Sequence, residues 1–98
     1  MFEIAKINKR LKEAEMAVDA LMSMARYGSV GSDRMRAQSL VYGIKRNIEE
    51  ISLIADSASN SVKLAPYFVR GIKMPLPQAL MYLVDQTAEA ANILGLNM

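Results

Sequence analysis

The sequence of 98 residues contains no cysteine, no histidine and no tryptophan. Without cysteine the chain forms no disulfide, no thiolate nucleophile and no cysteine-ligated metal site. Without histidine it forms no Ser-His or Cys-His catalytic pair and no histidine-metal site, and no side chain has an unperturbed pKa near neutrality. Any enzymatic chemistry would therefore depend on carboxylate, lysine or tyrosine side chains.

Long hydrophobic runs are also missing. The N-terminal stretch MFEIAKINKRLKEAE carries a charge every few residues, which is not the pattern of a secretory signal. The most apolar later stretch, ALMYLV at 79–84, ends at Asp85 and is too short to span a bilayer. These features predict a soluble, cytoplasmic protein without a membrane partner, and the absence of cysteine agrees with a reducing compartment.

Apolar side chains, in contrast, are abundant for so short a chain. Hydrophobic residues make up 52% of the sequence, and the mean hydropathy is +0.11. A chain of this length fits one small helical domain, which we place at residues 1–98, and a small domain leaves much of its surface in water. Part of the apolar surface is therefore expected to meet another chain, which predicts a homo-oligomer.

Charge is divided unevenly along the chain. Residues 1–48 contain nine lysines and arginines against five acids, giving +4, whereas residues 49–98 contain three against five, giving −2. The basic half is a candidate anion-facing surface, but its cations alternate with acids, which favours a solvated helix face. Lys45/Glu49 and Arg46/Glu50 have the spacing of exposed i,i+4 ion pairs.

Apolar residues at alternating intervals of three and four predict two long helices, over about residues 2–27 and 33–63. The first stripe is formed by Ile4, Ile7, Leu11, Ala14, Val18, Leu21 and Ala25. The second stripe is formed by Ala37, Val41, Ile44, Ile48, Ile51, Ala55, Ala58 and Val62. Both stripes are expected to point inward along one antiparallel hairpin.

A third helix is predicted after a proline-containing segment. Pro66 disfavours a helical residue before it, so the second helix should end by about residue 64. The segment PYFVRG suits one short helical turn, and IKMPLP should be extended. The third helix has Pro77 in its first turn and ends at Gly95. Its stripe is formed by Leu80, Leu83, Val84, Ala91 and Leu94. No strand pattern is found, so the predicted fold is all-α: an antiparallel hairpin plus a third long helix, in a three- to four-helix bundle.

The stretch ARYGSVGSDRMR joins the first two predicted helices. Gly28 lies where the first helix needs a C-cap, and Ser32 or Asp33 lies where the second needs an N-cap. The stretch is not a Walker loop, because its last glycine is not followed by lysine and Ser/Thr. A helix N-terminus beside arginines can still hold a phosphate or carboxylate, although Asp33 competes for that position. The candidate anion-binding residues are Ser29, Ser32, Arg34, Arg36, Lys45 and Arg46.

Glycine and methionine mark candidate interface positions. Gly43 lies inside the second predicted helix, where glycine costs about 1 kcal/mol relative to alanine, so we expect a close crossing by another helix to compensate. The alternative is a backbone floor for a ligand beside Arg36 and Arg46. Methionines off the stripes suit either adaptable partner surfaces or irregular gaps in a small core. Small residues at 87, 91 and 95 permit close helix approach, within the chain or between copies. The candidate interface residues are Met16, Met22, Met24, Gly43, Met81, Ala91 and Gly95.

Candidate catalytic and metal sites do not emerge from the carboxylates. Glu49 and Glu50 are adjacent and point in different directions on a helix, and no loop has the oxygen-ligand spacing of a metal site. We therefore expect a protein that is not an enzyme and has no cofactor or metal. Its general shape resembles helical-hairpin secretion proteins, bacteriocin immunity proteins, secretion chaperones and small phage-encoded proteins, but shape at this level carries no function.

The sequence is compatible with two functions. The favoured one is an interaction protein that binds copies of itself and then a protein target, as an assembly subunit, chaperone or inhibitor. The alternative is a binder of a phosphate-bearing ligand, either nucleic acid or nucleotide, through the basic N-terminal half. Nucleic-acid modules usually show a denser basic stripe with interleaved aromatic residues, which this half of the chain does not have.

Overall fold

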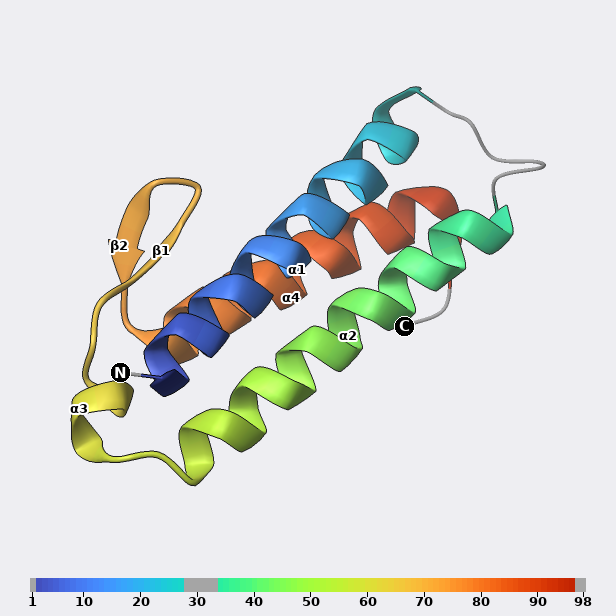
Figure 1. The fold of residues 1–98 in the computed structure, drawn as a ribbon. Coiled ribbons are helices and arrows are strands. Elements are labelled where there is room, and N and C mark those ends of the chain that lie inside the picture. The colour runs from blue at the N-terminus through green and yellow to red at the C-terminus, as the bar shows by residue number, and fades with distance from the viewer. Residues whose placement is uncertain (1, 28–33, 97–98) are drawn as a thin grey trace.

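A computed structural model describes residues 2–27 and 34–96 and shows a predominantly helical chain, as the sequence predicts. Three long helices dominate it: α1 (Phe2–Tyr27), α2 (Arg34–Asp56) and α4 (Leu76–Leu94). In Figure 1, α1 and α2 lie side by side and run antiparallel, and α4 lies behind them. The predicted bounds of the first helix are confirmed. The predicted caps Gly28, Ser32 and Asp33 lie outside the described residues.

The core lies between the inner faces of the three long helices. Of the first predicted stripe, the residues from Ile7 to Leu21 are buried, and its two ends, Ile4 and Ala25, are half-buried. On α2 the buried residues are Ala37, Val41, Ile44 and Ile51. Each fully buried aliphatic side chain contributes roughly 1.5 to 3 kcal/mol to the free energy of folding, so the buried stripes of α1 and α2 hold these two helices together.

Helix α4 begins and ends as predicted. Pro75 is its N-cap, a proline occupies its first turn, and Gly95 is a left-handed C-cap with φ 69°. The backbone N–H of Leu96 donates to the carbonyl of Ala91 at 2.8 Å, which closes the last turn. Of the small residues at 87, 91 and 95, Thr87 and Ala91 are buried and pack within the chain, whereas Gly95 is exposed.

The second predicted helix is shorter than expected, because α2 ends at Asp56 and a separate short helix, α3 (Asn60–Lys63), follows. The hydroxyl of Ser57 donates to the carbonyls of Leu53 at 3.2 Å and Ile54 at 3.3 Å. Serine side chains that bond locally to the backbone compete with helix propagation, which accounts for an end in this serine-rich stretch. The prediction of one continuous helix to residue 63 is therefore wrong, although Val62 is buried as its stripe requires.

Residues 67–74 form a β-hairpin, which corrects the predictions of a helical turn at 66–71 and of no strand. Strand β1 (Tyr67–Val69) pairs antiparallel with β2 (Ile72–Met74), with Phe68 opposite Lys73. Tyr67, Val69 and Met74 point into the core. The Tyr67 hydroxyl donates to the carbonyl of Val62 at 2.8 Å and so ties the hairpin to α3. Both strands have only three residues, too few for a period of two to be recognised in the sequence.

Within residues 2–27 and 34–96, Gly43 has no close neighbour outside its own helix. A Cβ atom built on Gly43 would meet no atom within 4 Å. The expected close crossing is therefore not made by any described helix of this chain, and the cost of a mid-helix glycine has no compensation within it.

Candidate functional site

The outer face of α2 carries a row of exposed apolar side chains. Met35, Tyr42 and Leu53 are 83%, 70% and 68% exposed. All three lie opposite the buried stripe of the same helix, because α2 packs on α1 and α4 with the face that contains Val41 and Ile44. Of the other exposed apolar residues, Met16 and Tyr27 lie on α1, Met81 and Ile93 lie on α4, and Leu64, Phe68 and Ile72 lie in the segment from the end of α3 to β2. Among the described helices, α2 carries the most such residues on one face, so its outer face is a candidate for a protein contact.

The spacing on this face is regular. Positions at alternating intervals of four and three, from residue 35 to residue 53, lie along one side of the helix, and apolar side chains occupy the first, third and last of them. We call this row the outer stripe; its residues are Met35, Ser39, Tyr42, Arg46, Glu49 and Leu53. At 1.5 Å per residue the row is about 27 Å long. Gly43 lies beside it, and a shallow hollow lined by Tyr42, Gly43 and Leu53 extends along this face to Val84 of α4.

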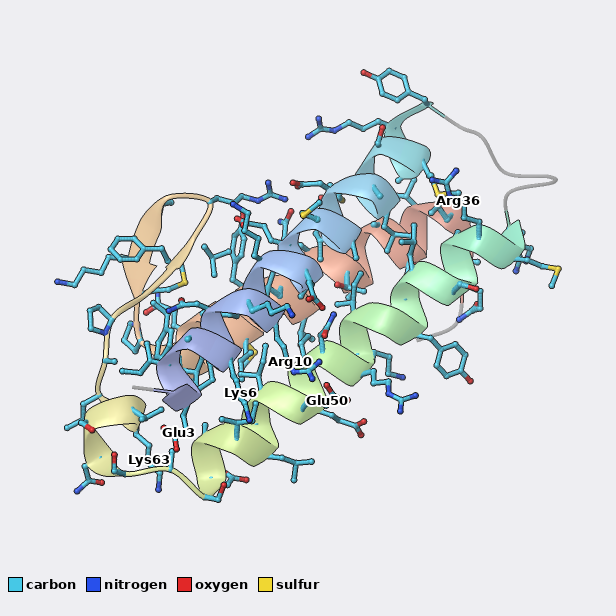
Figure 2. All side chains as sticks on the ribbon, in the orientation of Figure 1. Glu3, Lys6, Arg10, Arg36, Glu50 and Lys63 are labelled. Atoms are coloured by element: carbon cyan, nitrogen blue, oxygen red, sulfur yellow. The ribbon has the colours of Figure 1, made fainter. Side chains whose placement is uncertain are left out.

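Charged side chains tie one flank of the outer stripe to α1. Glu50 forms an ion pair with Arg10 of α1, and Figure 2 shows these two side chains between the helices. Arg10 also donates to Asn47 at 3.5 Å. Arg46 forms the predicted i,i+4 pair with Glu50 at 3.7 Å, a loose contact that leaves the guanidinium largely in solvent. This network joins the flank of α2 beside the outer stripe to α1.

The candidate anion-binding residues do not form one site. Ser29 and Ser32 lie outside the described residues. Arg34 donates to the carbonyl of Gly95 at 2.9 Å, so it is engaged at the C-terminus of α4. At 100° per residue, Arg36 and Lys45 project about 180° apart on α2. Arg36 and Arg46 are about 15 Å apart along the helix axis, and Figure 2 places Arg36 far from the Arg10–Glu50 pair. These cations are therefore dispersed over α2.

The candidate interface residues also lie on several different surfaces. Met16 and Met81 are exposed on α1 and α4, whereas Met22 and Met24 are half-buried against the core. Ala91 is buried, Gly95 caps α4, and Gly43 is exposed on α2. Of this set, Gly43 is the residue beside the outer stripe. Sequence reasoning missed Tyr42 and Leu53, although their spacing from Met35 repeats the heptad rhythm on the polar side of the helix.

A second polar cluster, which was not predicted from the sequence, joins the turn of the β-hairpin to α1. Arg70 pairs with Asp19 at 2.5 Å, and its backbone N–H donates to the carboxylate of Glu15. The hydrogen bond that the Arg70 guanidinium donates to the Asp19 carboxylate raises the pKa of Arg70 above its ordinary value. Arg70 has φ 53° and Gly71 has φ 75°, as in the two-residue turns of tight hairpins. The cluster is internally paired, so we interpret it as the anchor of the hairpin on α1.

Within residues 2–27 and 34–96, no three acidic side chains gather where they could hold a metal ion. No helix in the described part of the chain is long and apolar enough to cross a membrane.

Comparison with known proteins gives no relative: no family model, no curated protein and no solved structure matches this chain.

Proposed function

We propose that this protein is a small, non-enzymatic, cytoplasmic interaction protein that self-associates and, once assembled, binds a protein target as an assembly subunit, chaperone or inhibitor. The observation that supports the proposal is the outer stripe, where three large apolar side chains lie in water along one helix. Removing such surface from water stabilises a complex by roughly 25 cal/mol per Å² of apolar area, before the costs of association are subtracted.

Self-association is tested by measuring solution mass by light scattering over a range of protein concentrations. We expect the mass of the wild type to rise toward a dimer, and Tyr42→Lys/Leu53→Lys to remain monomeric because it places two charges in the outer stripe. The matched control is Met16→Lys/Met81→Lys, which makes the same change at two exposed apolar positions on other helices. It should behave as the wild type does. A wild type that stays monomeric at high micromolar concentration would contradict the proposal.

The alternative function, binding of a phosphate-bearing ligand, has a separate test. We expect no tight binding of DNA or RNA at about 150 mM salt, because the basic residues of α2 are dispersed and the Debye length is then only about 8 Å. A sub-micromolar affinity at that salt, lost in Arg36→Ala/Arg46→Ala, would favour the alternative over an interaction protein.

A further inference from the structure

We propose that two copies of the chain pair through α2, antiparallel, about a two-fold axis at the level of Ile44. The inference rests on the proposed self-association and specifies its geometry. Its basis is that the residues of the outer stripe, read from residue 35 to residue 53, are chemically complementary to the same residues read in the opposite direction. In antiparallel pairing about this level, the numbers of two residues that face each other sum to about 88. The two-fold axis repeats each contact, as in any isologous interface.

The facing residues match in chemistry. Met35 faces Leu53, an apolar pair at each end of the stripe. Ser39 faces Glu49, where a hydroxyl can donate to a carboxylate. Tyr42 faces Arg46, where a guanidinium can lie over an aromatic ring. Arg46 is held by Glu50 only at 3.7 Å in the single chain, so it is free to turn toward the ring of the partner copy.

Parallel pairing gives the opposite result. Each residue of the outer stripe would then face its own copy, so Arg46 would meet Arg46 and Glu49 would meet Glu49. Like charges placed directly opposite one another suppress a pairing mode. Within the outer stripe, the charges therefore favour the antiparallel arrangement.

The flank of the stripe that faces α1 supports the same arrangement. Gly43 lies next to the two-fold axis and faces Gly43 of the partner copy, so two helices can approach closely where neither has a side chain. Arg36 on this flank faces Glu50 of the partner copy; both side chains lie on the α1 side of α2 in Figure 2. On the other flank Lys45 faces its own copy, so the helices should close on the Gly43 side. In the dimer, Gly43 thus has a structural role, since it allows the two α2 helices to approach each other closely.

The contact is small, since it consists mainly of one helix from each copy. Interfaces of this kind lie at the low end of protein–protein areas, so we expect a reversible dimer of micromolar affinity. The experiment must therefore trap a complex that exchanges quickly.

The absence of cysteine from the chain makes disulfide trapping a clean test. Ser39→Cys and Glu49→Cys are prepared separately, then mixed and oxidised. In the proposed dimer, residue 39 of one copy faces residue 49 of the other, so the mixture should form a covalent heterodimer. Residue 39 lies about 15 Å along the axis from residue 39 of the partner copy, beyond the roughly 7 Å that a disulfide spans between Cα atoms. Each variant alone should therefore remain largely uncoupled. Met16→Cys measures the rate of coupling by random collision.

Three results would overturn the geometry. Coupling of either variant with itself as fast as in the mixture would indicate parallel or non-specific contact. Coupling of the mixture no faster than Met16→Cys, while light scattering shows a dimer, would place the interface elsewhere and leave the proposed self-association standing. A monomeric wild type at all concentrations would remove the proposed self-association and this geometry together.

Discussion

Replacement of Gly43 by alanine isolates the role of the mid-helix glycine. A Cβ at this position meets no atom of the described residues within 4 Å, so the added methyl group clashes with none of them. Alanine is favoured over glycine in a helix interior by about 0.8 to 1.0 kcal/mol. We therefore expect Gly43→Ala to stabilise the monomer by nearly this amount, which corresponds to a rise in Tm of roughly 4 to 8 °C for a domain of this size.

The assay is urea or thermal unfolding followed by circular dichroism, at a concentration low enough for the monomer to dominate. Ala88→Gly provides the matched control, because Ala88 is exposed within α4 and the reverse change should destabilise by about 1 kcal/mol. A Gly43→Ala variant that is less stable than the wild type, while Ala88→Gly behaves as expected, would refute the reasoning and show that the helix has a close neighbour at Gly43.

The same variant should respond differently in the dimer. If two α2 helices approach each other at Gly43, a methyl group on each copy separates them, and Gly43→Ala should weaken association while it stabilises the monomer. Light scattering and unfolding of the same samples measure the two effects separately. Association as strong as that of the wild type would show that Gly43 does not lie at the point of closest approach.

The remaining predictions concern the hairpin. Tyr67→Phe removes the hydrogen bond to Val62 and should destabilise by about 1 kcal/mol at neutral pH. Burial raises the pKa of Tyr67 above 10.0, so the wild type should lose stability as the pH rises from the unfolded-state pKa through the folded-state pKa of this residue. Tyr67→Phe should lack this part of the loss. A difference in unfolding free energy between wild type and variant that does not shrink at alkaline pH would contradict the buried, hydrogen-bonded state of the Tyr67 hydroxyl. Arg70 has φ 53°, which costs a non-glycine residue roughly 1 to 2 kcal/mol, and its ion pair with Asp19 is partly exposed and worth at most about 1 kcal/mol. In urea titrations Arg70→Gly should therefore be more stable than Arg70→Ala by about 1 kcal/mol or more, and equal stability of the two variants would show that the turn is unstrained.

Helix α1 shows how much the sequence alone predicts. Its apolar residues recur at intervals of three and four over the whole segment, and the structure buries the residues of that stripe from Ile7 to Leu21. Helix α4 was predictable for a local reason as well, because proline fixes the backbone at its start and glycine adopts the left-handed conformation at its end. Periodicity, proline and glycine act on neighbouring residues, so they can be recognised without knowledge of the fold.

The hairpin and the candidate site depended on contacts between distant residues. Three-residue strands are stable here because Tyr67 bonds to α3 and because Arg70 is held by Glu15 and Asp19 of α1, and neither contact can be deduced from local sequence. The sequence singled out Gly43 but predicted a neighbour that the described chain does not supply. The sequence also suggested that Arg34, Arg36, Lys45 and Arg46 form one anion-binding site, but the structure disperses these side chains over α2. The sequence by itself determined the three long helices, although not the end of α2, because a helix is built from interactions a few residues apart. Only the tertiary structure decided which face of α2 stays in water, because that depends on where α1 and α4 pack against it.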